Sequence, residues 1–241
     1  MNSHTENIVP AAASPVVDIA GGQAQHRFTW YTVGLVGFFV LDALLGRLIP
    51  QHEPRPFNVG AKIFTLVFQW LLFLVAYRGL RASGNSLAHV LGKSWSSLPE
   101  LWKDMKPALM VVGLIYVSTY SLMHLSAFKP PFMGQPKTGL QYFVSLLVAI
   151  SAGLTEEVIF RGLILSQFHI LTRNISVAVI LQSFVFALAH GGQQSITQFL
   201  KHSFSGCLFA YLALRRKSLW PAILAHVLLD VTSCTVQYLT K

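Results

Sequence analysis

Charged residues are scarce in this chain: they make up 11% of its 241 residues, and only nine are acidic. A soluble domain carries about 25% charged residues, so the composition excludes an ordinary soluble protein. Hydrophobic residues account for 53% of the chain, and the mean hydropathy is +0.54. We therefore expect an integral, multi-pass membrane protein.

Cysteines, repeats and basic clusters are also few. Cys207 and Cys234 lie in apolar segments without metal-like spacing, which argues against a disulfide framework. No internal repeat is evident, which argues against a transporter built from inverted repeats. The net charge of +9 comes from basic residues that are scattered among the loops without a basic stripe. We therefore expect the lipid bilayer, with its anionic headgroups, as a partner and expect no nucleic acid.

The apolar segments predict an all-α, polytopic transmembrane helix bundle of about seven to eight spans, since a span needs about 20 apolar residues. Residues 1–26 are polar and predict a disordered tail. The first apolar run is longer than the core of a signal peptide, and we interpret it as an uncleaved signal anchor. The expected spans lie near residues 28–49, 58–77, 107–127, 139–171, 174–190, 196–214 and 219–239.

The segment 139–171 is too long for one perpendicular crossing. It must tilt, break near Gly153 or Gly162, or project from the bilayer.

Residues 81–106 interleave apolar residues and lysines, and they include Trp95 and Trp102. This pattern predicts an interfacial amphipathic segment, with an ordinary polar loop as the alternative. Basic residues gather in this loop and in the loop after the sixth span, which favours a cytoplasmic N-terminus.

Four acidic residues lie inside apolar segments, where a lipid-facing carboxylate costs roughly 2.5–3.5 kcal/mol on insertion scales. They are Asp42, Glu156, Glu157 and Asp230. A spacing of four residues lets Glu157 pair with Arg161, whereas Glu156 is rotated from Glu157 by about 100° and faces other neighbours. We therefore expect a structural ion pair of Glu157 with Arg161, and a Glu156 that is free to face a polar cavity inside the bundle.

Two histidines complete the polar set. His190 ends an apolar run, and His226 shares a helical face with Asp230 at a spacing of four. A carboxylate with two imidazoles can deprotonate a water, direct it at a peptide carbonyl and stabilise the oxyanion. Alternatively, Glu156, His190 and His226 are typical of a catalytic zinc site with one position left for water. The pattern does not choose between these chemistries.

Each of these residues also has a structural explanation. A buried histidine is often an interhelical hydrogen-bonding group, and Asp42, which has no nearby partner, is expected to snorkel or to bond another helix. A further hypothesis is an ion- or proton-coupled transporter that uses Asp42, Glu156 and Asp230 as a relay. The conjunction of all these polar groups in one third of the chain favours a catalytic site.

Three motifs, taken in this order, resemble those of the CAAX-protease and bacteriocin-processing family (CPBP, or Abi): Glu156-Glu157-x-x-x-Arg161, Phe186-x-x-x-His190 and His226-x-x-x-Asp230. The resemblance covers roughly residues 138–238 and implies an intramembrane peptidase that cleaves a membrane-associated protein or peptide. It implies that Glu156 activates the water and that His190 and His226 position the water or the oxyanion. Asp230 would orient His226 or bind the substrate carbonyl, and Phe186 would belong to the substrate site.

The resemblance also sets the remaining expectations. It divides the chain into N-terminal transmembrane helices at 27–137 and a catalytic helical core at 138–238. The family is regarded as glutamate-dependent, so no cofactor is certain and zinc is the metal to test. The implied location is a bacterial cytoplasmic membrane. Some members are immunity or maturation proteins without an assigned substrate, so the alternative is a non-enzymatic, partner-binding membrane protein.

One difficulty follows from the expected spans. If the last three each cross the membrane fully, His190 and His226 lie at opposite faces and cannot share a site. We therefore predict that residues 191–196 form a re-entrant, water-lined turn, which is tolerated at membrane depth inside a protein.

Overall fold

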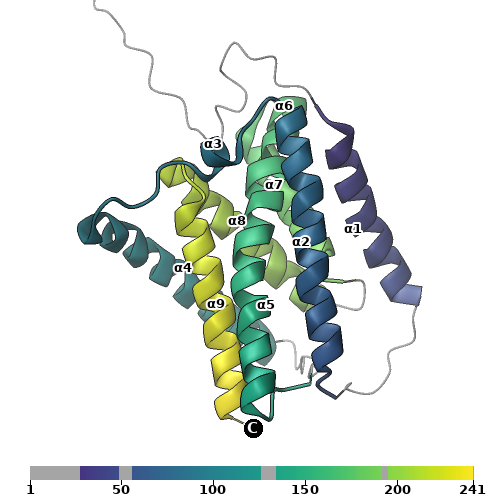
Figure 1. Cartoon of the computed structure of the whole chain (residues 1–241), viewed down its shortest axis with the longest axis vertical. Coiled ribbons are helices and arrows are strands. Elements are labelled where there is room, and N and C mark those ends of the chain that lie inside the picture. The colour runs from purple at the N-terminus through teal and green to yellow at the C-terminus, as the bar shows by residue number, and fades with distance from the viewer. Residues whose placement is uncertain (1–27, 49–55, 126–133, 192–194, 241) are drawn as a thin grey trace, which may run out of the picture.

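The computed structural model describes residues 28–48, 56–125, 134–191 and 195–240 (Figure 1). The disordered tail predicted for residues 1–26 lies outside the described residues. Within the described ranges every regular element is helical and no strand is present, which confirms the all-α class.

The helices, in chain order, are α1 (Trp30–Leu48), α2 (Val59–Ala82), α3 (Leu87–Leu91), α4 (Leu98–Leu125), α5 (Gly139–Glu157), the π-helical segment η2 (Val158–Ile164), α6 (Leu165–Thr172), α7 (Ile175–Leu188), α8 (Ile196–Arg216) and α9 (Trp220–Leu239).

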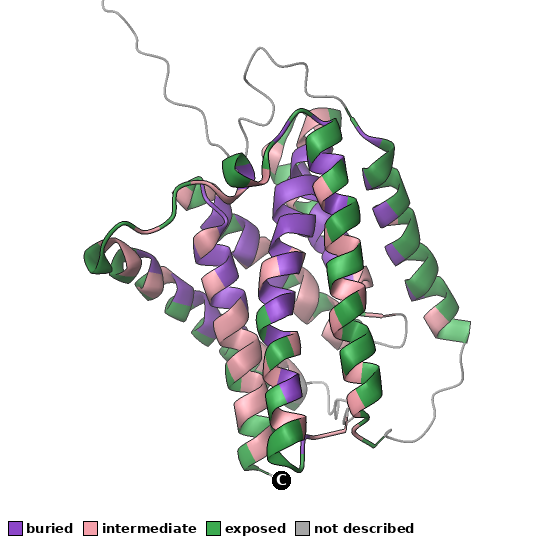
Figure 2. Cartoon of the chain, in the orientation of Figure 1, coloured by how far each residue is buried: buried purple, intermediate pink, exposed green. Residues whose placement is uncertain are grey.

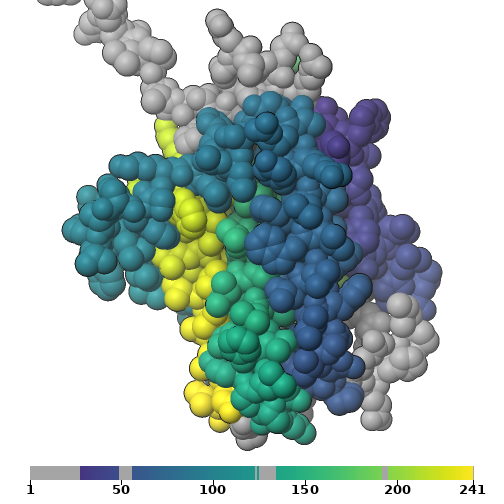
Figure 3. Space-filling view, viewed as in Figure 1, coloured from purple at the N-terminus to yellow at the C-terminus, as the bar shows by residue number. Residues whose placement is uncertain are grey.

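Helices α5 and α9 pack side by side in the middle of the bundle (Figure 1). Helix α2 packs on α5 and α1 packs outside α2, while α4 leans against α8 and α9. In the space-filling view, α9 is visible as a strip between α4 and α5 (Figure 3). Buried residues concentrate around η2, all seven residues of which are buried, whereas the outer faces of α1 and α2 are exposed (Figure 2).

Side-chain caps start the helices of the core. Thr138 and Gln141 form a capping box at the start of α5, and Ser195 and Gln198 form another at the start of α8. The Asn174 side chain accepts two backbone N–H groups at the start of α7. These caps satisfy backbone donors that the first turn of a helix leaves unpaired, so they define where the site-bearing helices begin.

Five helical segments in the described part of the chain are long and apolar enough to cross a membrane: Trp30–Leu48, Val59–Ala82, Leu98–Leu122, Gly139–Thr172 and Trp220–Leu239. They agree with a polytopic membrane protein.

The two other expected spans differ from these five. Helix α7 has 14 residues, about 21 Å at 1.5 Å per residue, against a hydrocarbon core of about 30 Å. Helix α8 has 21 residues but is not apolar enough to count as a span.

The expected interfacial segment 81–106 is divided among three elements. Helix α2 ends at Ala82, α3 is a short helix, and α4 already begins at Leu98. The observed helix therefore starts before residue 107, where the expected span begins, and Pro107 lies inside it.

The long segment Gly139–Thr172 is continuous, with no break at Gly153 or Gly162. It widens into the π-helical turns of η2 directly after Glu157, and π-helical turns inside α-helices are frequent at functional sites. Gly153 allows α5 to approach α9 closely, because a Cβ atom there would lie 2.5 Å from Cγ2 of Val227.

Candidate active site

The ion pair of Glu157 with Arg161 is present at the centre of the bundle. Nη1 of Arg161 donates to Oε1 of Glu157 at 2.8 Å, and both side chains are fully buried. The guanidinium also donates to the Gly206 carbonyl at 3.2 Å and lies 4.4 Å from the ring centroid of Phe186. A buried ion pair needs such additional partners to offset its desolvation, so Arg161 ties η2 to α7 and α8.

Glu157 has a second partner that helix spacing did not indicate. Nδ1 of His226 lies 2.8 Å from the same Oε1 atom. A carboxylate oxygen accepts, so Nδ1 carries the proton and donates, and Nε2 is the ring nitrogen that faces outward. Glu157 thereby holds both Arg161 and His226, and it fixes the orientation of the imidazole.

The outward nitrogen of His226 faces two carboxylates. Nε2 lies 3.9 Å from Oε2 of Glu156 and 3.6 Å from Oδ2 of Asp230. Both separations exceed direct hydrogen-bond lengths and suit a bridging water. Oε2 of Glu156 is buried and has no hydrogen-bond partner within the described ranges. The side chains of Glu156 and Asp230 are 22% and 34% exposed, whereas that of Glu157 is not exposed at all.

His190 lies in the turn after α7, where its Nδ1 donates to the carbonyl of Phe186 at 2.8 Å. The Phe186 ring contacts both histidines, with centroid distances of 4.7 Å to His190 and 5.9 Å to His226. The two histidines therefore lie in the same region of the bundle, because the short α7 does not carry His190 to the opposite face. Among the described contacts, none joins His190 directly to Glu156. Half of the predicted re-entrant turn, residues 192–194, lies outside the described residues.

Phe186 supports this site and does not offer a surface to a substrate. It is 2% exposed, and its ring packs against Arg161 and Phe209 as well as the two histidines. This burial argues against the substrate-binding role that the motif implied. Asp230, which is partly exposed, remains accessible.

Helix α8 contributes groups that the motifs did not indicate. The imidazole of His202 stacks on that of His190 with centroids 4.0 Å apart, and Phe209 stacks on His226 at 4.8 Å. Lys201 is within electrostatic reach of Asp230. A signal was available in the sequence: Gln198, His202 and Ser205 recur every three to four residues in an apolar segment, as a polar helical face would.

Asp42 lies away from this cluster. It is exposed on α1, and no contact in the described part of the chain joins it to Glu156 or Asp230. The ion or proton relay of the transporter hypothesis therefore has no described contact that links Asp42 to the other two carboxylates.

The candidate zinc ligands do not converge. Within the residues that the structure describes, no three His, Cys, Asp or Glu side chains are grouped as metal ligands. Nε2 of His226 faces Glu156. The bond from Nδ1 of His190 to a backbone carbonyl leaves Nε2 of that ring able to ligate a metal, but no described contact brings the ring to Glu156. The three side chains are therefore not grouped as a catalytic zinc requires, and we derive no step through a metal.

Comparison with known proteins supports the motif interpretation. Residues 138–232 match the family model described as Rce1-like, type II CAAX prenyl endopeptidase, and this range contains all three motifs. No curated protein and no solved structure matches the chain. The family is one of proteases, so at family level the match supports an intramembrane endopeptidase. Residues 138–232 are thus similar to the CAAX-protease family, as their motifs indicated.

Proposed function

We propose that this protein hydrolyses a peptide bond of a membrane-associated protein or peptide, with Glu156 as the base that activates water. The observation that carries the proposal is the buried Oε2 atom of Glu156, which has no hydrogen-bond partner among the described residues and lies 3.9 Å from Nε2 of His226. A water that bridges these two atoms would be held by one carboxylate and one imidazole.

Glu157 is the positioning residue in this proposal. Its Oε1 atom accepts from Arg161 and from His226, both at 2.8 Å. A carboxylate held by two donors is a weak base, and its complete burial keeps it away from a substrate. Its task is to keep the His226 ring turned toward Glu156 and Asp230.

The reaction requires one proton carrier. Glu156 takes a proton from the water, the water oxygen bonds to the carbonyl carbon, and the carbonyl π electrons move onto its oxygen. When the intermediate collapses, the C–N bond breaks and Glu156 gives the proton to the leaving nitrogen. The oxyanion is stabilised by a donor, and a protonated His226, flanked by two carboxylates, supplies one through Nε2.

His190 has a different task in this scheme. Its Nδ1 atom already donates to the Phe186 carbonyl, so Nε2 of the neutral ring is an acceptor. His190 therefore orients a water or a substrate N–H group and does not stabilise the oxyanion. Asp230, at 34% exposure, would bind the substrate or orient Nε2 of His226.

The test compares protein termini in membranes from native host cells that carry the wild-type chain or Glu156→Gln. Asp42→Asn serves as the matched control, because Asp42 is also an acidic residue in an apolar helix but is exposed on α1. We expect new termini with the wild type and with Asp42→Asn, and their loss with Glu156→Gln. The same comparison with a metal chelator tests zinc independently.

Two outcomes would reject the proposal. If the new termini persist in Glu156→Gln at the wild-type level, Glu156 is not the base that activates water. If the wild type generates no new termini and its cellular phenotype survives in Glu156→Gln, the protein acts instead as a non-enzymatic, immunity-type or partner-binding membrane protein. The bacterial cytoplasmic membrane and a cytoplasmic N-terminus are part of the proposal, and protease protection of the loops tests the orientation.

A further inference from the structure

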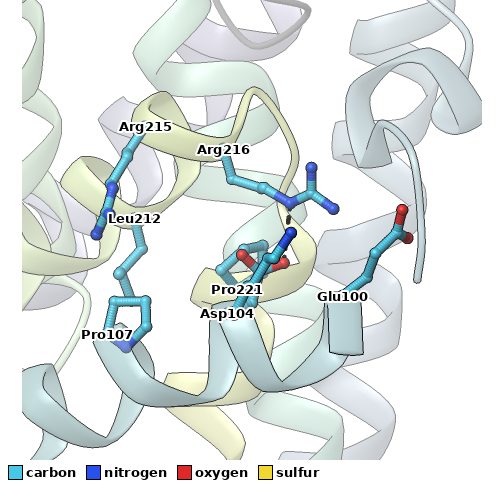
Figure 4. A pocket seen from close by; sticks show the side chains of 8 residues that line it. Glu100, Asp104, Pro107, Leu212, Arg215, Arg216 and Pro221 are labelled. Carbon is cyan, nitrogen blue, oxygen red and sulfur yellow. Dashed lines mark hydrogen bonds and ion pairs between the residues drawn. The ribbon is translucent and has the colours of Figure 1, made fainter. Parts of the chain in front are cut away.

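A second polar site lies at the junction of α4, α8 and α9 (Figure 4). It is a cavity of about 270 Å³, lined by Leu212, Pro107 and Pro221 and by several charged groups. Pro221 lies in the first turn of α9, and His226 follows it five residues later, about 7.5 Å along the helix. The cavity is therefore separate from the Glu156 site but is built on the same helix.

The acidic groups of this cavity already have partners. Asp104 is buried and accepts from Nε of Arg216 at 2.9 Å and from the Trp95 indole at 2.8 Å. Glu100 accepts from the backbone N–H of Ser96 at 2.9 Å and pairs with a lysine outside the cavity. Both carboxylates are therefore already paired, and among the basic groups that line the cavity only Arg216 is neutralised by one of them.

The basic groups, in contrast, remain in excess. Lys103 and Arg215 both line the cavity, both are exposed, and within the described ranges neither has an ion-pair partner. Arg216 is oriented by Asp104 through Nε alone, so its two terminal nitrogens can still donate. Figure 4 shows Arg216 turned toward Asp104 and Arg215 extending on the side of Pro107. Lys103, Arg215 and Arg216 thus line one cavity and can each donate to an oxyanion in it.

The cavity lies where two candidate membrane spans begin. Two of the candidate spans, Leu98–Leu122 and Trp220–Leu239, begin at this end of the molecule. The rings of Trp95 and Trp220 lie 5.7 Å apart beside it, and Trp102 is 57% exposed. Tryptophan is enriched at the level of lipid headgroups, so we expect the phosphate of a phospholipid to be the oxyanion that reaches this cavity.

We propose that the cavity between α4 and the α8–α9 turn binds the phosphate of an anionic phospholipid headgroup, with Lys103, Arg215 and Arg216 as its donors. A zwitterionic lipid competes poorly, because its own ammonium group neutralises its phosphate. The bound headgroup fastens the start of α9 to α4. This inference does not depend on peptidase activity.

Native mass spectrometry of the full chain, released from vesicles of phosphatidylcholine with increasing phosphatidylglycerol, tests the proposal. We expect the wild type to retain phosphatidylglycerol in preference to phosphatidylcholine. The double variant Lys103→Gln/Arg215→Gln should bind phosphatidylglycerol about 30-fold more weakly, since each of the two basic groups near the surface contributes about 1 kcal/mol. The matched control is Lys106→Gln/Arg81→Gln, which removes two exposed charges that do not line the cavity, and it should retain the wild-type preference.

A third arm separates the sources of phosphate. Inorganic phosphate added to phosphatidylcholine vesicles should not reproduce the binding, and it should not displace phosphatidylglycerol at millimolar concentration. Displacement would overturn the lipid assignment in favour of a free phosphate. An equal loss of phosphatidylglycerol in the variant and the control would overturn the site, because only total charge would then matter.

Discussion

The segments Gly139–Thr172 and Val59–Ala82 have nearly the same mean hydropathy, 1.8 and 1.9, but very different surroundings. In the first, 67% of the most apolar stretch is buried inside the bundle, and in the second only 6% is. The first carries two glutamates and an arginine in its interior, whereas the charges of the second lie near its ends. Hydropathy therefore locates both spans, but only the polar residues distinguish the interior of the bundle from its lipid-facing rim.

The two segments should differ most in the loss of unfolding free energy that follows when an arginine is replaced in each. Arg161→Leu leaves Glu157 buried without one of its two donors, which should cost about 3–5 kcal/mol of unfolding free energy. Arg78→Leu removes an exposed charge near the end of α2, and it should change the unfolding free energy by less than about 0.5 kcal/mol. Unfolding in mixed micelles, followed by circular dichroism, measures both.

A second variant separates lost charge from lost packing at Arg161. In Arg161→Leu/Glu157→Gln, the buried carboxylate is neutral, so part of the stability should return. If Arg161→Leu and Arg78→Leu destabilise equally, or if the double variant is less stable than the single one, the ion pair does not hold the interior together.

The next largest loss of stability should follow when a side chain is added where α5 and α9 approach each other closely. A Cβ atom at Gly153 meets Cγ2 of Val227 at 2.5 Å and its backbone nitrogen at 3.0 Å. Gly153→Ala should therefore cost about 1–3 kcal/mol of stability and move His226 away from Glu156, so proteolytic activity should fall as well. In α1, Gly37 has no neighbour within 4 Å of an added Cβ, so Gly37→Ala should be neutral or stabilise the helix by up to about 1 kcal/mol. A stable and active Gly153→Ala variant would show that the two helices can separate without harm.

The smallest effect concerns hydrogen bonds between helices. The Tyr142 hydroxyl bonds to Thr235 at 2.9 Å and joins α5 to α9, whereas the Thr65 hydroxyl in α2 bonds to the Ala61 carbonyl of its own helix. Tyr142→Phe should cost about 0.6 kcal/mol, and Thr65→Ala should cost less. Thermal unfolding in the same detergent measures the stability of both variants. A larger loss of stability for Thr65→Ala than for Tyr142→Phe would contradict the difference between the interior and the rim.

Local spacing predicted the contacts that lie within one helix. The pairs of Glu157 with Arg161 and of His226 with Asp230 are both four residues apart, and both are close in the structure. The bond between Glu157 and His226 joins residues 69 positions apart. It depends on how α5 packs on α9, which helical periodicity does not encode, so the sequence assigned Glu157 to Arg161 alone.

The position of His190 in the bundle could not be predicted from residue spacing either. An apolar run was interpreted as a full span, but its helix ends at Leu188 after 14 residues. Packing of α7 on α8 then places His190 against His202, a residue outside the three motifs. Motifs therefore located the carboxylates of the candidate site, while the packing of short helices determined which groups surround them.

The most direct test of the central claim is the cleavage rate of Glu156→Gln, purified in lipid nanodiscs, on a substrate identified from the comparison of termini. We expect at least about a 100-fold lower rate than the wild type, as for loss of a general base, with an unchanged unfolding midpoint. Glutamine keeps the shape of the side chain but cannot accept the proton from water. A rate equal to that of the wild type would contradict the account.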